Sequence, residues 1–488
     1  MIKLENISYK TDGKTLLDNI TVDFSNKKCW AITGANGSGK SLLAMIIAGI
    51  LKPSSGAIIS DEKTGYTSFE LQQKVMAEER RKDNSRFMHG SVDSGTLVKD
   101  FVSEDCEGFE NRLFDKYKLM FGIEGIMERG LRFLSTGEFR KVLLCKALSC
   151  GPDCLIIDDP FDGLDVLSRE NLNKLIIDLI KSGERIFIVS SRQSEIPSEI
   201  ENVLCLDEGK ISYEPRSSQK QCAEQDAGRG YVSLNNNYLK AIEYNASQCN
   251  SPRNSMRNDN IISMTNVSVA YNGIKIISEI NWSVGKGDRW KITGPNGCGK
   301  STLMSLINGD NPKAYLNDIS LFGRKRGSGE SIWEIKNRIG FVSGDLQMNF
   351  RVRTNVMDTA LSGFFDSIGL YDAVSGLQKQ EAETWLEAAR LGDKKDRMFE
   401  ELSYGEKRLA LIIRAFIKKP QLLILDEPCQ GLDEKNTTSV MDLINMISED
   451  SDITILLITH DAKLIPQGFA KHLLFKPYPL GGYTAFAI

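Results

Sequence analysis

The stretch GPNGCGKS, Gly294–Ser301, decides the expected fold of its half of the chain. It follows the short apolar run RWKIT and opens the segment KSTLMSLING. The glycines let consecutive backbone N–H groups turn inward around phosphate oxygens, and a helix that starts at the lysine adds its positive N-terminal end. Strand, glycine loop and helix in this order give the pattern GxxGxGKS the context that a phosphate-binding loop needs. A chance glycine loop is the alternative that this order disfavours.

The same pattern occurs earlier in the chain. Three motifs recur in one order, the first after 260 residues and the other two after 268: GANGSGKS (34–41) as GPNGCGKS (294–301), LSTGE (134–138) as LSYGE (402–406), and LIIDDPFDGLD (155–165) as LILDEPCQGLD (423–433). Because order and spacing are retained, the sequence predicts a tandem duplication of a domain of about 210–230 residues. We expect domains over 1–212 and 261–488, joined by a linker over 213–260 in which Ser, Asn and Gln dominate.

Composition narrows the class of protein. The net charge of −4 over 488 residues offers no basic field for nucleic acid, so a nucleic-acid partner is disfavoured. No apolar run approaches the roughly 20 residues needed to cross a bilayer, and the N-terminal MIKLENISYK alternates like a strand. The cysteines stand singly without a CxxC pair, which disfavours zinc and iron–sulfur sites. We therefore expect no direct membrane insertion and a cytoplasmic protein, or one held by a partner on the cytoplasmic face of the inner membrane.

Short apolar runs with branched side chains alternate with helical segments in both copies. The runs are CLIID and RIFIVSS in the first copy, and LLILD and ITILLITH in the second. Their length and flanking residues indicate strands buried on both faces of a parallel sheet. The sequence therefore predicts an α/β fold.

Charged and hydroxyl side chains around the loops suit a nucleotide and its magnesium ion. Lys40 and Lys300 are expected to reach the outer phosphates. The predicted Mg²⁺ ligands are two loop hydroxyls and two strand-end carboxylates: Ser41, Ser301, Asp158 and Asp426. The other expected nucleotide contacts are Gly34, Asn36, Gly37 and Gly39 in the first copy, and Gly294, Asn296, Gly297, Gly299 and Thr302 in the second.

Each LSxGE motif opens a predicted helix shortly before the apolar run that ends in aspartate. A serine hydroxyl at an open helix N-terminus can receive an anion. Ser135 and Gly137 in the first copy, and Ser403 and Gly405 in the second, are therefore candidate nucleotide contacts. A plain helix cap is the alternative for the two serines.

GxxGxGKS, LSxGE, LLILDEP and GLD in this order resemble the ATP-binding cassette (ABC) ATPases. The resemblance covers nearly the whole chain outside the linker. It implies two P-loop NTPase domains, each with a mostly parallel sheet core and a helical subdomain, that bind ATP with Mg²⁺ and hydrolyse it. It also implies that the two cassettes pair head to tail within the chain, so that each ATP meets the phosphate loop of one domain and the LSxGE of the other.

The two copies differ where the family holds its catalytic groups. Glu427 matches the family's base after the strand-end Asp, whereas Asp159 is one methylene shorter, and a misplacement near 1 Å can cost about 10²-fold in rate. His460 matches the histidine that contacts the γ-phosphate, and Ser191 aligns with it. We expect hydrolysis at the site of Lys300, Asp426, Glu427 and His460, closed by Ser135 and Gly137. The site of Lys40, Asp158 and Asp159, closed by Ser403 and Gly405, is expected to bind ATP more than it cleaves it. The alternative is that Asp159 works adequately and both sites turn over.

The adenine contact differs as well. Tyr271 lies 23 residues before Gly294, where the family stacks an aromatic ring on the base, and the same spacing in the first copy falls on Thr11. Tyr9, two residues away, is either a substitute or an ordinary strand residue at a sheet surface.

Longer segments narrow the resemblance to one subfamily. LFGRKRGSGESIWEIKNRIGFVS (321–343), LSGFFDSIGLY (361–371) and DDPFDGLD resemble bacterial tandem cassette proteins that are grouped with molybdate-uptake ATPases and are also labelled photorepair proteins. This implies the ATPase component of an ABC-type, molybdate-like transport system, with an integral-membrane permease as partner. The basic loop GRKRGSG within the first segment is expected to be a solvated surface turn.

Other outputs of the same motor stay open. The alternative is an ATPase that is not coupled to transport, either a ribosome-associated translation factor or a DNA-repair or regulatory ATPase. A translation factor should carry a long, charged, helical linker, and an excision-repair ATPase should carry zinc-spaced cysteines; neither is present. However, transporter cassettes place a Gln directly after the strand IGFV-S, where this chain has Gly344, with Gln347 three residues on. The first copy has Phe69 there, followed by Gln72 and Gln73, so both copies depart from the pattern by which transporter cassettes couple to a permease.

Overall fold

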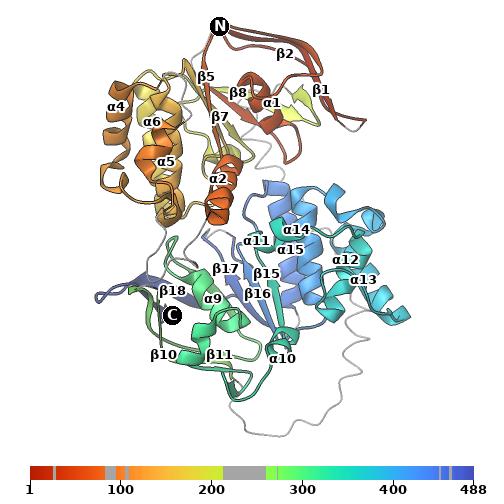
Figure 1. Ribbon diagram of the computed structural model, residues 1–488. Coiled ribbons are helices and arrows are strands. Elements are labelled where there is room, and N and C mark those ends of the chain that lie inside the picture. Colours follow the sequence, from red (N-terminus) through yellow and green to blue (C-terminus); the bar gives the residue numbers. More distant parts are fainter. Residues whose placement is uncertain are drawn as a thin grey trace. The chain divides into compact units, whose positions relative to one another are not determined.

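Two compact units divide the chain, Met1–Arg229 and Gly230–Ile488 (Figure 1). The computed structural model describes residues 1–11, 13–25, 29–82, 95–104, 109–212, 260–271, 273–449, 452–460 and 464–488. The predicted linker over 213–260 lies outside the described residues except for Asn260. Each unit combines sheet and helices, which confirms the predicted α/β class.

The described strands of the first unit form two sheets. A small antiparallel sheet has the order β2-β1-β4, and a larger sheet has the order β5-β6-β7-β3-β8-β9, with all neighbours parallel except β8 and β9. The strands are β1 (Ile2–Thr11), β2 (Lys14–Asp23), β3 (Trp30–Thr33), β4 (Ser55–Ser60), β5 (Thr64–Ser68), β6 (Cys154–Asp158), β7 (Ile186–Ser190), β8 (Asn202–Asp207) and β9 (Lys210–Ser212). The helices are α1 (Lys40–Ile47), α2 (Phe69–Arg81), α3 (Val98–Ser103), α4 (Asn111–Phe121), α5 (Thr136–Ser149) and α6 (Val166–Lys181), with 3₁₀ turns η2 (Glu124–Ile126), η3 (Leu131–Phe133) and η4 (Gln193–Glu195).

In the second unit the antiparallel and parallel parts belong to one sheet. Its order is β14-β13-β10-β11-β19-β18-β12-β17-β16-β15, and the two parts join where Ile277 of β11 lies opposite Tyr483 of β19. The strands are β10 (Asn260–Tyr271), β11 (Ile274–Gly285), β12 (Arg289–Thr293), β13 (Asp318–Leu321), β14 (Arg324–Lys325), β15 (Ile339–Val342), β16 (Leu422–Asp426), β17 (Thr454–Ile458), β18 (Lys471–Pro477) and β19 (Tyr483–Ala487).

The helices of the second unit include the long helix that follows LSYGE. They are α9 (Lys300–Asn308), α10 (Ile332–Asn337), α11 (Gly344–Asn349), α12 (Val356–Leu361), α13 (Gly376–Ala388), α14 (Tyr404–Phe416) and α15 (Glu434–Ser448), with 3₁₀ turns η5 (Pro312–Leu316), η6 (Ser362–Phe365), η7 (Gly392–Lys394) and η8 (Phe399–Glu401). Trp385 of α13 meets Phe416 of α14 edge to face, with ring centroids 4.7 Å apart. No helix among the described residues combines the length and the apolar character that a membrane crossing requires.

Both faces of the parallel sheet are covered, as the apolar runs predict. In β16, Leu423 and Leu425 pack into a core with α12, α14 and α15, whereas Leu422 and Ile424 pack into a second core with α9, β10 and β11. Successive strand residues point to opposite faces, so a strand covered on both sides has to be apolar throughout. The strand β6 alternates between the two cores of the first unit in the same way.

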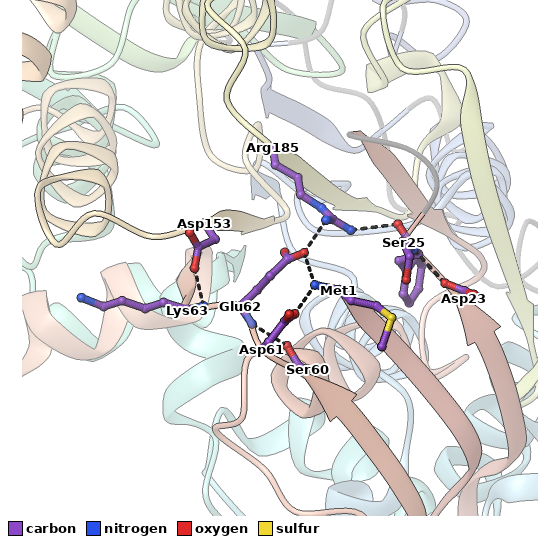
Figure 2. Close-up of polar contacts among 10 residues, drawn as sticks. Met1, Asp23, Ser25, Ser60, Asp61, Glu62, Lys63, Asp153 and Arg185 are labelled. Atoms are coloured by element: carbon purple, nitrogen blue, oxygen red, sulfur yellow. Dashed lines mark hydrogen bonds and ion pairs between the residues drawn. The ribbon is translucent and has the colours of Figure 1, made fainter.

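Glu62 links the two sheets of the first unit (Figure 2). It follows β4, and its Oε1 accepts a hydrogen bond from Arg185, which directly precedes β7, at 2.5 Å. The same oxygen lies 2.8 Å from the amino group of Met1, at the start of β1. The next residue, Lys63, donates its backbone N–H to Asp153 before β6 at 2.8 Å. These contacts fix the edge from which the strands of the parallel sheet run toward the phosphate loop.

The basic loop GRKRGSG (323–329) includes the short strand β14, which pairs with β13, and the turn that follows it. Arg326 turns inward from it, pairs with Glu330 at 3.0 Å and stacks over the ring of Tyr315. Arg324 and Lys325 are exposed, and Lys325 pairs with Asp318 at 2.9 Å. The loop therefore presents little unpaired positive charge, in agreement with the predicted surface turn.

Candidate functional site

A cavity of about 350 Å³ in the second unit brings together the residues predicted to bind the nucleotide. It is lined by Tyr271, Ile276, Asn296, Gly297, Gly299, Lys300, Ser301, Thr302, Asp426, Glu427 and His460. These residues come from the hairpin of β10 and β11, the loop between β12 and α9, the first turn of α9, and the carboxyl ends of β16 and β17. The carboxyl edge of a parallel sheet is the usual place for a ligand in such folds. Sequence reasoning missed Ile276, an ordinary apolar strand residue whose role depends on how β11 approaches the loop.

The last glycine of each loop is required by its surroundings. Gly299 has φ 95°, and a Cβ there would lie 2.8 Å from the side chain of Ile277. Gly39 has φ 96°, and its Cβ would lie 2.6 Å from Leu17. Left-handed backbone and close strand contact both exclude a side chain. The hairpin of each unit thus presses directly on the start of α9 or α1.

The loop lysines are buried and held by their own loops. Nζ of Lys300 donates to the carbonyl oxygens of Gly294 and Pro295, at 2.8 and 2.9 Å, and Nζ of Lys40 donates to the carbonyl oxygen of Ala35 at 2.8 Å. A buried ammonium is costly unless anions or dipoles surround it. Both lysines are therefore placed to balance phosphate charge.

The strand-end aspartates fit the magnesium role. Burial raises the pKa of Asp426 to about 6, and the charge of Glu427 adds to the rise. Burial also raises the pKa of Asp158 to about 6, although hydrogen bonding to the hydroxyls of Ser41 and Tyr66 acts to lower this pKa. Oδ2 of Asp158 accepts from the hydroxyl of Tyr66 at 3.0 Å, while its buried Oδ1 has no hydrogen-bond partner among the described residues. A buried carboxylate oxygen without a donor suits a cation or its water, so the residues fit Mg²⁺.

The residue after each aspartate has a strained backbone conformation where the chain turns out of its strand, and we call this turn the corner. Glu427 has φ 49° and Asp159 has φ 46°, a region that non-glycine residues rarely adopt. The N–H of Glu427 donates to the carbonyl oxygen of Ile458 at 3.0 Å, and that of Asp159 donates to Val189 at 2.9 Å. Strain of this kind gathers at functional sites. Both units therefore turn the predicted catalytic side chain sharply out of its strand.

The two corners hold different chemistry. The carboxylate of Glu427 contacts Nε2 of His460, and both side chains line the cavity. In the first unit, burial raises the pKa of Asp159 to about 8, and the charges of Asp162 and Asp158 contribute. A carboxyl group with this pKa carries its proton in most nucleotide-free molecules near neutral pH.

Strand register decides which residue takes the place of His460. Val189 lies opposite Asp158 as Ile458 lies opposite Asp426, so Ser191 stands where the second unit has His460. Ser190, one residue earlier, donates to Glu195 at 2.9 Å. Glu195 also lies 3.6 Å from Arg169 and from Arg192. An ion-pair cluster thus follows β7 in the first unit.

Ser135 and Ser403 of the LSxGE motifs, which we call the signature motifs, are helix caps, and α5 and α14 are the signature helices. Oγ of Ser403 accepts the N–H of Glu406 at 3.3 Å, the carboxylate of Glu406 accepts the N–H of Ser403 at 2.9 Å, and Ser135 forms the same box with Glu138. The cap uses the hydroxyl oxygen as acceptor, so its proton is the group that can donate to an anion. Ser403 does not line the cavity of its own unit.

The signature glycines pack against the neighbouring helix. A Cβ on Gly405 would lie 2.4 Å from the side chain of Asn436 in α15, and one on Gly137 would lie 3.1 Å from that of Ser168 in α6. Asp433 of the GLD motif caps α15 through the N–H of Asn436 at 2.8 Å. The motifs LSYGE and GLD therefore meet at two adjoining helix N-termini. Like Ser403, Gly405 is not among the residues that line the cavity.

Tyr271 is anchored at the rim of the cavity. Its hydroxyl accepts from Asn311 at 2.8 Å, and Nζ of Lys313 lies 5.1 Å from its ring centroid. Thr11 lies opposite Lys14 as Tyr271 lies opposite Ile274, so Thr11 is its counterpart by register. Tyr9 packs instead against the core of the small sheet. The strand alternative for Tyr9 therefore accounts for its position.

Comparison with known proteins identifies the family of this chain. The family model described as ABC transporter matches residues 17–162 and 277–430. The chain is 38% identical over 473 residues to the ABC transporter ATP-binding protein ModF of Escherichia coli (strain K12). The aligned segment covers 96% of this chain and 95% of the relative. It is 27% identical over 478 residues to an uncharacterized ABC transporter ATP-binding protein of Schizosaccharomyces pombe, across 95% of each.

The solved structures show the same fold. A crystal structure of archaeal ribosome recycling factor aABCE1 in complex with ribosomal stalk protein aP1 matches with a TM-score of 0.58 at 18% identity. The match covers 98% of this chain and 89% of that one, and at this identity it establishes the fold alone. Two matched regions, two phosphate loops and a relative of similar length lead to one conclusion: the chain belongs to the ABC transporter family and is a tandem ATP-binding cassette ATPase.

Proposed function

We propose that the second unit hydrolyses ATP and that the first unit binds ATP with little turnover. The contact between Glu427 and His460 in the cavity carries this proposal. The first unit has Asp159 and Ser191 at the corresponding positions. A protonated carboxyl group and a hydroxyl cannot replace a carboxylate and an imidazole in activating water.

The second unit supplies each group that hydrolysis needs. Lys300 and the loop N–H groups bind the phosphates, and Tyr271 offers its ring to the base. Glu427 accepts a hydrogen bond from the attacking water and orients it toward the γ-phosphate, while His460, which contacts the same carboxylate, is expected to meet the γ-phosphate. Ser301 and Asp426 would hold Mg²⁺, which when bound neutralises charge on the β- and γ-phosphates.

The first unit keeps its binding groups and lacks an active base. Lys40 and the loop glycines repeat those of the second unit, and Asp158 offers its unpartnered oxygen to Mg²⁺. Asp159 is one methylene shorter than Glu427, and a proton on its carboxyl group makes that group a weaker acceptor for a proton from water. The family resemblance further supports a paired state in which Ser135 and Gly137 close the ATP of the second unit, and Ser403 and Gly405 that of the first.

For the cellular output we infer an ATPase component of an ABC-type transport system. The 38% identical relative is named an ABC transporter ATP-binding protein. The subfamily resemblance points to a molybdate-like anion as solute and to an integral-membrane permease as partner. A second candidate is an ATPase that acts without a permease, because the side chain of Gln347 is bonded to Arg408 and Tyr404 within its own unit.

Capture of partners separates the two outputs. Glu427→Gln should retain ATP and hold the closed state, so the tagged variant is expressed in its native cell and its partners are identified. The control is Glu427→Gln combined with Lys300→Ala, which should not retain ATP at that site. An integral-membrane permease found only with the single variant supports transport. Ribosomes, nucleic acid or no partner at all would overturn the transport proposal.

A further inference from the structure

A buried arginine on the signature helix α14 donates a hydrogen bond to the main chain at the corner formed by Glu427. Arg408 lies on the second turn of α14 and is fully buried. Its Nη1 donates to the main-chain carbonyl oxygen of Glu427 at 3.2 Å, its Nε donates to Oε1 of Gln347 at 2.6 Å, and its Nη2 donates to the hydroxyl of Tyr404 at 3.3 Å. One guanidinium therefore joins three segments that are far apart in sequence.

Gln347 completes the connection. It belongs to α11, which starts directly after β15, and it is buried. Its Nε2 donates to the main-chain carbonyl oxygen of Tyr404 at 2.9 Å. The side-chain oxygen of Gln347 thus accepts from Arg408, and its side-chain nitrogen donates to the first turn of α14. Gln347 does not line the cavity.

The first unit repeats this arrangement in a different sequence. Nη1 of Arg140 donates to the carbonyl oxygen of Asp159 at 2.9 Å, and its Nε donates to Gln72 at 2.9 Å. Gln72 in turn donates to the carbonyl oxygen of Thr136 at 3.4 Å. Arg140 and Arg408 occupy the same position of the duplicated motif, in TGEFRK and YGEKRL, so both copies have kept these contacts.

The hydrogen bonds of Arg408 and Gln347 hold the main chain of Glu427 in place. The N–H of Glu427 is held by Ile458 and its carbonyl oxygen by Arg408, on either side of a left-handed φ of 49°. Within the described residues the hydrogen bonds of Arg408 all go to neutral oxygens. A buried cation without a counter-ion does not favour folding, whereas a fixed corner favours catalysis because small misplacements of the reacting groups are costly.

We propose that Arg408 and Gln347 are positioning residues for ATP hydrolysis, which hold the Glu427 corner and tie it to the first turn of the signature helix. The inference rests on the proposed hydrolysis by the second unit. Arg408 acts through the main chain of Glu427, and its hydrogen bonds within the described residues include none to the phosphate loop. Its removal should therefore lower the rate of the chemical step and leave ATP binding unchanged.

The test compares two arginines of one helix. Arg408→Lys and Gln347→Leu are measured against Arg414→Lys, because Arg414 is a partly buried arginine of the same helix α14. Within the described residues its hydrogen bonds go to Ser362 and to the carbonyl oxygen of Ser367, at 3.1 and 2.9 Å, and not to the turn that holds Glu427. We expect Arg408→Lys and Gln347→Leu to lower kcat by about 10- to 100-fold with KM for ATP unchanged. Arg414→Lys should lose stability and keep kcat per folded molecule.

A cycle with the catalytic residue separates positioning from general damage. If Arg408 acts only through Glu427, Arg408→Lys should not lower the residual single-turnover rate of Glu427→Gln any further. Equal kcat losses in Arg408→Lys and Arg414→Lys, or a rise in KM that accounts for the loss, would overturn the positioning role. Wild-type turnover in Glu427→Gln would instead overturn the proposed site of hydrolysis and, with it, this inference. Loss in Glu427→Gln with full kcat in both Arg408→Lys and Gln347→Leu would refute the positioning role alone.

Discussion

Nε2 of His460 contacts Oε1 of Glu427 in the second unit. The two residues follow β16 and β17, which are neighbours in the parallel sheet, so chain turns at one edge bring them together. The first unit has the same pair of strands and the same left-handed corner, but it places Asp159 and Ser191 there. The duplication has therefore kept the backbone of the site and changed its chemistry.

Replacing each corner residue should separate the two sites. Glu427→Gln is expected to lower ATP turnover by about 10²- to 10⁴-fold, the range for loss of a general base. Asp159→Asn should keep most of the turnover, because it replaces a carboxyl group that is already protonated at neutral pH. Steady-state phosphate release from the full chain measures both. Comparable losses in the two variants would show that both sites turn over.

The pH dependence of stability should report on Asp159. Burial raises the folded-state pKa of this carboxyl group from 3.8 to about 8, so between these pH values the folded chain binds more protons than the unfolded one. The free energy of unfolding therefore falls as pH rises through this window, in total by about 1.4 kcal/mol for each unit by which the folded-state pKa exceeds the unfolded-state pKa. Asp159→Asn cannot ionise and should gain stability relative to wild type from about pH 5 to pH 8. Urea unfolding of the nucleotide-free proteins would contradict this if the two pH curves ran parallel.

The signature glycines should differ in their tolerance of a methyl group. Gly405→Ala forces a Cβ to 2.4 Å from Asn436, which we expect to destabilise the protein by about 1–3 kcal/mol, as overpacking does. Gly137→Ala meets Ser168 at 3.1 Å and should cost less. Thermal unfolding of both variants measures the difference. Adding Asn436→Ala should restore much of the loss in Gly405→Ala, and failure to do so would point to backbone strain rather than a side-chain clash.

Ser135 allows its capping and anion-binding roles to be separated. Ser135→Ala should cost about 1 kcal/mol of stability because the cap is lost, whereas Ser135→Asp keeps a capping oxygen and should stay close to wild type. Aspartate has no proton to donate and repels phosphate, so Ser135→Asp should still reduce ATP turnover. Stability and turnover are measured on the same samples. Full turnover in Ser135→Asp would leave the plain helix cap as the role of this serine.

The sequence determined the parts of this protein that depend on neighbouring residues. Glycines at fixed spacing turn the phosphate loops, Ser–x–x–Glu forms the capping boxes, and apolar runs give strands that are buried on both faces. The offset between the copies also marked the exchange of Glu427 for Asp159. Each loop, cap and strand is encoded within about ten residues, and the offset is read from the repeat of such segments, so all of these features can be inferred before the fold is known.

Only the tertiary structure decided how distant segments meet. The hydroxyl of Tyr66 on Asp158, the side chain of Asn436 against Gly405 and the grip of Arg408 on Glu427 each join residues from different crossovers of the fold. Strand order and register set these contacts, and a shift of one residue would turn every side chain of a strand to the opposite face. The motifs thus named the chemistry, while the register of the parallel sheet determined which side chains surround it.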